Sequence, residues 1–272
     1  MVDILIVGLG VIGGSLAKRL SLSNNIYGLD INKHSLDLAY KEGIIKNNSN
    51  DVKELIQKSD TIIVCLSAPQ TLKWVQENKM FFNSKQLIID VFGVKGFYYP
   101  LLKEELIGFK YASIHPMSGN ENSGYEYSKD DVFINGNMLV IENEYQEELN
   151  VLFNLLGVNK VSIMNVDEHD KKIAYLSGLP HAVSVSLLNI EKDTDLKRFS
   201  GPSFNDMTRI GYINSDLWSS LFLENAYLPE YLLKLEKELR RMRKLIQNKD
   251  ISKIKKKLDS SRKKRKKFND NK

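Results

Sequence analysis

Over the first 165 residues, short apolar runs alternate with longer segments of mixed polarity. The runs are bounded by glycine or polar residues, which is typical of parallel strands buried on both faces. The segments between them have the length and composition of helices. We therefore predict strands at 3–7, 26–29, 61–66, 86–91, 111–114, 138–141 and 159–163, and helices at 12–21, 32–42, 51–58, 69–80 and 144–156. This order predicts an α/β fold, a Rossmann-type doubly wound parallel sheet covered by helices on both faces.

The strand pattern stops near residue 165. Beyond it we predict one long helix over 167–191, kinked by Gly178 and Pro180. An irregular segment over 200–215 then leads into helices over 216–248. The predicted parts are a dinucleotide-binding domain (1–165), a smaller all-helical domain (166–250) and a basic tail (251–272).

Charge is concentrated at the C-terminal end. The chain has a formal net charge of +5, but residues 251–272 hold eleven Lys/Arg and two Asp, a net of +9, which leaves about −4 for the other 250 residues. The basic run 262–267 could contact nucleic acid or an anionic surface. No aromatic residues interleave with it to stack on bases. We interpret the tail as solvated and frayed, and expect no nucleic-acid partner.

The chain has no run of eighteen apolar residues, so we expect no transmembrane helix and no membrane partner. Its start lacks the basic and apolar regions of a signal peptide. Cys65 is the single cysteine, which excludes an intrachain disulfide. We expect a cytoplasmic protein without a metal site.

A glycine-rich sequence, GLGVIG, lies between the first predicted strand and the first helix. Gly8 allows a tight turn, Gly10 lets the backbone approach a pyrophosphate, and Gly13 allows close packing of helix and strand. The helix N-terminus favours the phosphate charge. The residues predicted to bind a dinucleotide here are Gly8, Leu9, Gly10, Val11, Ile12 and Gly13.

Two further segments belong to the same predicted site. Asp30 ends the second strand, where a carboxylate binds ribose hydroxyls and repels a 2′-phosphate, so we predict NAD rather than NADP; the alternative is an ordinary helix cap. Ser67, Ala68 and Pro69 follow the strand 61–66 and should contact the nicotinamide half, although Pro69 would also suit a first helical turn.

His115 directly follows the strand 111–114, at the end of the strand where ligands bind in such folds. An imidazole beside a nicotinamide ring is a natural general base for a substrate hydroxyl during hydride transfer. We therefore predict that His115 is catalytic.

Several short motifs occur in one order along the chain. They are GLGVIGGS at 8–15, DVFGVK at 90–95, HPMSG at 115–119, LPH at 179–181, FNDMTRI at 204–210 and WSSLFLEN at 218–225. With them, the chain resembles the prephenate/arogenate dehydrogenase family of tyrosine biosynthesis, from residue 1 to about 245. The glycine motif is shared by many dehydrogenases, whereas the combination of the later motifs is far more specific.

The resemblance implies oxidative decarboxylation of a cyclohexadienyl acid. Hydride leaves C4 for NAD⁺ while the C4 hydroxyl is deprotonated, and loss of CO₂ restores an aromatic ring. His115 matches the family's base, and Arg209 matches the arginine that binds a substrate carboxylate. His181 and Trp218 match residues of the substrate pocket. The resemblance also implies a homodimer formed by the helical domain.

Other interpretations of these residues stay open. Arg209 could form a structural ion pair with Asp206, and Trp218 with Phe222 could be a helical core stripe. Asp206 and Glu121 match a charged network near the arginine but could also be surface acids.

The chain departs from the family pattern at two positions. Gly93 stands where the family commonly has a serine that assists the histidine and the substrate oxygen, and Gly178 replaces a pocket histidine. Gly93 is still counted among the predicted substrate-binding residues. Lys95, in the same motif, could be only a solvated helix end.

We predict an NAD-dependent prephenate dehydrogenase with a small-molecule substrate. Arogenate is the alternative substrate. A second alternative is a two-domain β-hydroxy acid dehydrogenase that uses a helix lysine, for which Lys171 and Lys172 are the candidates. A third is a non-catalytic NAD-sensing or nucleic-acid-associated protein that depends on the basic tail.

Overall fold

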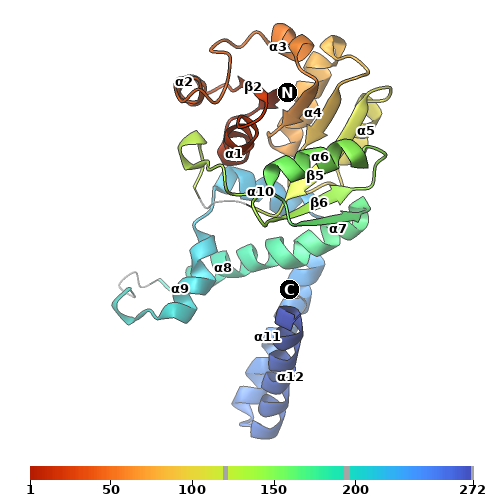
Figure 1. Cartoon of the computed structure of the whole chain (residues 1–272). Coiled ribbons are helices and arrows are strands. Elements are labelled where there is room, and N and C mark those ends of the chain that lie inside the picture. The colour runs from red at the N-terminus through yellow and green to blue at the C-terminus, as the bar shows by residue number, and fades with distance from the viewer. Residues whose placement is uncertain (119–121, 193–196, 271–272) are drawn as a thin grey trace. The chain divides into compact units, whose positions relative to one another are not determined.

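The computed structural model describes residues 1–118, 122–192 and 197–270. Within them the chain forms two compact units, Met1–Ala226 and Tyr227–Lys272. The first unit is built on a seven-stranded sheet with the strand order β2-β1-β3-β4-β5-β6-β7 (Figure 1). Its strands are β1 (Asp3–Val7), β2 (Asn25–Leu29), β3 (Thr61–Val64), β4 (Leu87–Asp90), β5 (Lys110–Pro116), β6 (Asn137–Ile141) and β7 (Lys160–Met164).

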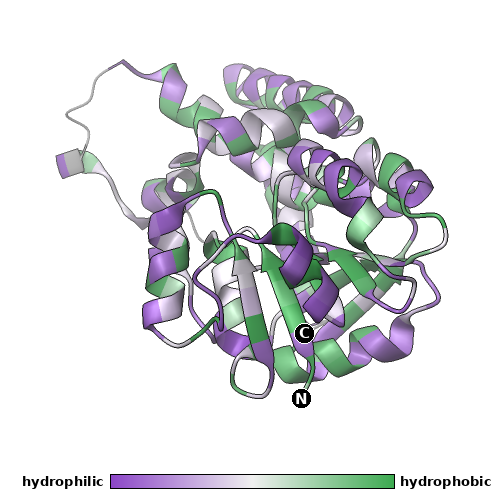
Figure 2. Ribbon diagram, turned by 90° about the horizontal axis from the view of Figure 1, so that it is seen from above, coloured by the Kyte–Doolittle hydropathy of each residue, from purple (hydrophilic) through white to green (hydrophobic). Residues whose placement is uncertain are grey.

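The helices between these strands cover both faces of the sheet. Along β1 the side chains alternate, so Ile4 and Ile6 enter one core and Leu5 and Val7 enter the other. The strands are mostly hydrophobic in colour and the surrounding helices carry polar outer surfaces (Figure 2). The helices are α1 (Val11–Leu20), α2 (Lys33–Lys41), α3 (Val52–Lys58), α4 (Ala68–Asn78), α5 (Tyr98–Glu105) and α6 (Gln146–Leu156). The predicted α/β fold and all seven predicted strands are confirmed.

The prediction of a wholly parallel sheet is wrong at one strand pair. β6 pairs antiparallel with β5, while the remaining neighbours are parallel. A parallel pair needs a long crossover, usually a helix. The described part of the connection from β5 to β6 contains one short helical turn, Tyr125–Tyr127, and the chain returns in the opposite direction.

The predicted long helix is present but changes its pitch. α7 (Val166–Ile173) runs into a π-helical turn (Ala174–Gly178) and continues as α8 (Leu179–Ile190). Pro180 lies in the first turn of α8, where its missing N–H is tolerated. The wider π turn is thus how the helix passes the glycine and the proline without ending.

By length and composition alone, this stretch could cross a membrane. An 18-residue stretch within Val166–Ile190 has a mean hydropathy of 1.3, and 17% of this stretch is buried. Such a result is weak evidence, because helices of soluble proteins pass the same test. Polar residues interrupt the stretch, so it contains no continuous run of eighteen apolar residues.

Two predictions for the C-terminal part are wrong. The segment 200–215, expected to be irregular, contains α9 (Pro202–Thr208) before α10 (Ser215–Glu224). The tail expected to fray forms α12 (Ile251–Asp270), which follows α11 (Leu228–Gln247) in the second unit. Lys257 pairs with Glu238 of α11, and none of the α12 side chains is buried, so the tail is solvated but helical. A boundary near residue 165 stays a prediction.

Candidate active site

The glycine turn joins β1 to α1 at the carboxyl edge of the sheet. Gly8 has a φ of +92°, and a Cβ there would lie 2.8 Å from the carbonyl oxygen of Cys65. A Cβ on Gly13 would lie 1.8 Å from the carbonyl oxygen of Gly8. Only glycine therefore lets α1 start so close to β1. At Gly10, in contrast, a Cβ would meet nothing within 4 Å, so the backbone is open to an approaching group.

The other residues of this turn close its base. Leu9 is fully buried, and Val11 and Ile12 open α1 as half-buried residues. Among the described residues no side chain caps α1. The positive end of the helix dipole and the amides of its first turn thus face the open side of the turn, an arrangement that suits a phosphate.

Asp30 lies directly after β2 and is tied to the glycine turn. Its Oδ2 accepts a hydrogen bond from the Leu9 amide at 2.6 Å, and its Oδ1 accepts one from the Asn32 amide at 2.7 Å. The side chain that caps α2 is that of Asn32, which accepts from the His34 amide. Asp30 is therefore held beside the open turn and is not the cap of α2.

The loop after β3 lies against the same turn. The Cys65 amide donates to the carbonyl of Val7 at 2.7 Å. Ser67 precedes α4 and donates its hydroxyl to Gln70, Ala68 is buried, and Pro69 is exposed in the first turn of the helix. β1 and β3 are neighbouring strands, but the chain continues from β1 to β2 on one side and from β3 to β4 on the other. Open α/β sheets bind ligands at such a point.

A buried charge cluster lies at the end of the neighbouring strand β4. Lys95 is fully buried, and its Nζ lies 2.6 Å from Oδ1 of Asp90, with a second bond of 2.9 Å to the carbonyl of Ile114. Tyr111 and Ser113 donate to the same carboxylate at 2.6 and 3.0 Å. Burial lowers the pKa of Lys95, and the Asp90 carboxylate opposes that shift. The interpretation of Lys95 as a solvated helix end is wrong.

His115 is the second-last residue of β5 and belongs to a row of three side chains. Its Nδ1 lies 3.1 Å from Nε2 of His169, whose Nδ1 lies 2.7 Å from Oδ1 of Asp170. His169 and Asp170 are buried residues of α7. Burial, then His169, then the Lys95 ammonium hold the pKa of His115 well below its ordinary value. All three disfavour the positively charged form of the His115 ring.

The opposite edge of the His115 ring faces Gly93. A Cβ on Gly93 would lie 3.6 Å from His115 Nε2 and 3.3 Å from Cδ2 of Leu221 in α10. No hydrogen bond from the described residues reaches Nε2. The glycine thus leaves space beside the nitrogen that is free to accept a proton.

α10 also carries the second group of predicted residues. Trp218, one turn before Leu221, stacks on His181 of α8 with ring centroids 3.6 Å apart. The π turn supplies the carbonyl of Ser177, which lies 2.9 Å from His181 Nδ1. Burial lowers the pKa of His181, and the positive charge of Arg209 lowers it further. Trp218 also contacts Phe222, with ring centroids 5.5 Å apart, and is half-buried.

The remaining predicted residues lie on the surface. Arg209 is exposed, directly after α9, and Asp206 is exposed within that helix. Glu121 and Gly119 lie outside the described residues. Lys171 and Lys172 are about half-exposed and pair with Asp167 and Glu168 on their own helix, so neither points into the His115 site.

Sequence reasoning missed the partners of His115. The available signal was a His-Asp pair six residues after the last predicted strand, within the predicted long helix 167–191. Asn225, at the end of α10, was missed as well; it is buried and donates to the carbonyl of Asp170 at 3.0 Å. In the described ranges no group of three or more His, Cys, Asp or Glu side chains could hold a metal ion.

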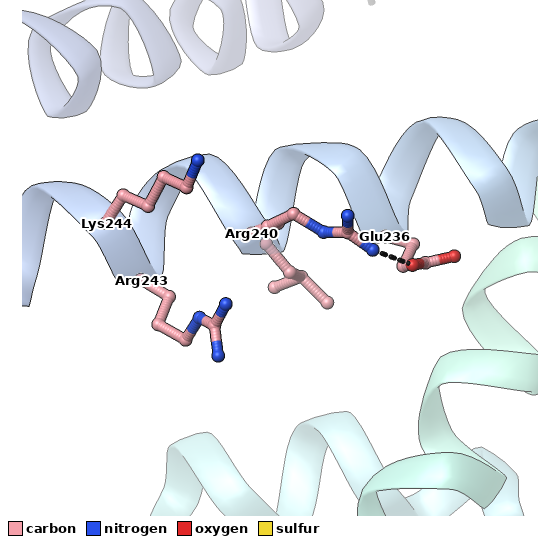
Figure 3. A pocket seen from close by; sticks show the side chains of 5 residues that line it. Glu236, Arg240, Arg243 and Lys244 are labelled. Carbon is pink, nitrogen blue, oxygen red and sulfur yellow. Dashed lines mark hydrogen bonds and ion pairs between the residues drawn. The ribbon is translucent and has the colours of Figure 1, made fainter.

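A pocket in the second unit lies on α11 and contains none of the predicted residues (Figure 3). Arg240 there donates to Glu236 at 2.6 Å. The side chains that line the pocket are Glu236, Leu239, Arg240, Arg243 and Lys244.

Comparison with known proteins identifies the family. Residues 13–165 match the model of the nucleotide-binding domain of prephenate dehydrogenase, and residues 165–260 match the model of its dimerization domain. The chain belongs to the prephenate dehydrogenase family. The resemblance found in its short motifs is thereby confirmed.

Individual members of the prephenate dehydrogenase family agree with this. The chain is 29% identical over 236 residues to the Bacillus subtilis enzyme and 32% identical over 244 residues to that of Lactococcus lactis. These matches cover 82% and 86% of this chain but 64% and 67% of the relatives, so the chain spans about two thirds of their length. The crystal structure of the A. aeolicus enzyme in complex with hydroxyphenyl propionate and NAD⁺ is 26% identical, with a TM-score of 0.89 over 98% of both chains.

Proposed function

We propose that this protein catalyses the NAD⁺-dependent oxidative decarboxylation of prephenate to 4-hydroxyphenylpyruvate, a step of tyrosine biosynthesis. The observation that carries the proposal is His115 at the carboxyl end of β5, whose Nε2 lies beside Gly93, a residue with no side chain to occupy it, and whose pKa is lowered by burial. The family models and the named prephenate dehydrogenases support it.

The glycine turn fits a dinucleotide. The space in front of Gly10 and the uncapped start of α1 would receive the pyrophosphate, and Asp30 would accept hydrogen bonds from the ribose hydroxyls. Bound there, NAD⁺ supplies the hydride acceptor. Ser67, Ala68 and Pro69 would contact the nicotinamide half.

The proposed reaction needs a base and a carboxylate site from the protein. The O–H bond at C4 breaks and its proton moves to His115 Nε2. The C4–H bond breaks, its hydrogen is transferred as hydride to NAD⁺, and a C4=O double bond forms. The bond to the ring carboxylate then breaks, CO₂ leaves, and its electron pair makes the ring aromatic. The phenolic oxygen finally takes back one proton. Arg209 would bind a substrate carboxylate through its planar fork, and His181 and Trp218 would line the pocket.

The first test is substrate choice. Purified protein is mixed with NAD⁺ and, in parallel, with prephenate, arogenate or 3-hydroxyisobutyrate, and NADH formation is recorded. We expect the highest kcat/KM with prephenate, and NADP⁺ to replace NAD⁺ poorly because Asp30 repels its 2′-phosphate. A higher kcat/KM with arogenate would reassign the substrate. Turnover of the β-hydroxy acid alone would overturn the proposal.

We also propose a cytoplasmic homodimer that uses the helical part of the chain, residues 166–250, as its substrate and dimerisation domain. The match of 165–260 to a dimerization domain supports this. So does the apolar stretch 166–190, where Leu176, Leu188 and Ile190 are exposed in the single chain. Light scattering should give the mass of two chains, and Leu176→Glu should shift the protein toward the mass of one.

A further inference from the structure

The row of Asp170, His169 and His115 crosses from α7 to the end of β5. Asp170 is fixed at its far end: its Oδ1 accepts from the Lys95 amide at 3.0 Å and its Oδ2 from the Gly96 amide at 2.7 Å. Asn225 holds the Asp170 backbone carbonyl from α10. The loop amides of Lys95 and Gly96 therefore orient the carboxylate, while Asn225 holds the backbone of the same residue.

The donors and acceptors fix the direction of the row. A carboxylate only accepts hydrogen bonds, so His169 must carry a proton on Nδ1, which lies 2.7 Å from Oδ1 of Asp170. Burial lowers the pKa of His169, although its hydrogen bond to Asp170 raises it, and in the neutral ring with its proton on Nδ1 the lone pair lies on Nε2. Nε2 of His169 thus accepts, and Nδ1 of His115, 3.1 Å away, must donate.

This direction decides which nitrogen of His115 acts as the base. With the proton on Nδ1, the lone pair of the neutral ring lies on Nε2, the nitrogen that faces the space beside Gly93. A neutral imidazole in water favours the opposite tautomer, with its proton on Nε2. Gly93 has no side chain that would select between the two.

We propose that His169 and Asp170 are positioning residues that hold the His115 ring in place in its Nδ1–H tautomer, so that Nε2 presents its lone pair to the substrate proton. This inference rests on the proposed function of His115 as the base. In the step itself the substrate O–H bond breaks and an Nε2–H bond forms.

The proposal is tested first without substrate. Nitrogen-15 NMR of the histidine rings in the free protein reports which nitrogen of His115 carries the proton, and His115→Asn assigns its signals. We expect the Nδ1–H tautomer in the wild type. We expect the Nε2–H tautomer to become the major form in His169→Phe, which keeps the ring's bulk but removes both hydrogen bonds. An Nε2–H tautomer in the wild type would overturn the proposal without any variant having to fold.

Kinetics with prephenate and NAD⁺ complete the test. In His169→Phe we expect kcat to fall by roughly 10²–10⁴-fold, because His115 then presents a proton where a lone pair is needed. Both KM values should change little. His169→Gln offers an amide N–H to Asp170 and a carbonyl to His115, and should recover at least a tenfold part of that loss. Lys172→Ala removes an exposed ion pair of the same helix and is the matched control, with unchanged kcat.

The outcomes separate the two proposals. If His115→Asn loses activity while His169→Phe keeps its kcat and its tautomer, the positioning role is wrong and the base stands. If the wild type does not oxidise prephenate, the proposed function is wrong, and the NMR spectra alone judge the tautomer. If His169→Phe shows the Nε2–H tautomer with an undiminished kcat, the tautomer has no part in catalysis and the positioning role is again overturned.

Discussion

The glycine turn and the His115 row lie along the same edge of one sheet but are built differently. The turn is made of backbone from one continuous segment, and its geometry depends on the absence of side chains at Gly8 and Gly13. The row is made of side chains from β5 and α7, fixed by the backbone amides of Lys95 and Gly96. The geometry of the cofactor side is therefore a local property of the sequence, whereas the proton-handling side exists only after the fold has formed.

The largest effect should come from the reacting end of the row. His115→Asn removes the lone pair that accepts the substrate proton, so we expect kcat to fall by roughly 10²–10⁴-fold. The Kd for NAD⁺, measured by calorimetry, should stay within about twofold of the wild type, since the glycine turn is untouched. Near-normal turnover would end the assignment of His115 as the base. A large change in NAD⁺ affinity would show that the two regions are not independent.

Arg209→Gln tests whether a residue outside both regions binds a carboxylate of the substrate. Loss of one charge-assisted contact to a carboxylate costs about 1.5–3 kcal/mol, which corresponds to a roughly 10–100-fold higher KM for prephenate. The KM for NAD⁺ should not change. An unchanged KM for prephenate would place the carboxylate elsewhere.

A pair of glycine variants tests the backbone side of the comparison. Gly13→Ala places a methyl group against the carbonyl of Gly8, so we expect the free energy of unfolding to fall by about 1–3 kcal/mol. Gly10→Ala is the matched control, because its methyl group meets nothing within 4 Å. It should change stability by about 1 kcal/mol or less but raise the KM for NAD⁺. Denaturant titration and initial rates check both, and equal losses of stability would contradict this account of the turn.

The smallest effect concerns acid pH. The base acts only when unprotonated, and its pKa lies below the ordinary histidine value of 6.5. The kcat/KM for prephenate should therefore stay constant as the pH is lowered through 6.5 and fall only at more acid pH. The groups facing His115 that contribute are His169 and Lys95, with Asp90 and Asp170 behind them. An acid limb centred at or above 6.5 would contradict the burial argument.

The sequence predicted the strands and the glycine turn well because both depend on local patterns. It placed the start of a helix at Lys95 but gave no bounds for α5, which begins at Tyr98. It did not predict that β6 is antiparallel to β5, because the described part of their connection holds no crossover helix. α12 was missed because charge alone suggested disorder, although lysine and arginine are good helix formers.

For the candidate site, the motif resemblance identified single residues but not their contacts. Lys95 was weighed as a solvated end because a lysine is rarely buried, and nothing near it in the sequence shows that Asp90, Tyr111 and Ser113 converge on one point. His169 and Asp170 were missed for the same reason. Their roles follow from contacts between residues more than fifty positions apart.

The buried pair of Lys95 and Asp90 also limits how this family member can change over evolutionary time. Replacing either partner alone leaves an uncompensated charge in the core, which costs about 3–5 kcal/mol, whereas replacing both by well-packed apolar residues is often neutral. That cost is a large part of the total stability of a typical domain. Stepwise replacement of the pair therefore passes through a destabilised intermediate, and Gly93 lies in the short loop that joins the two partners.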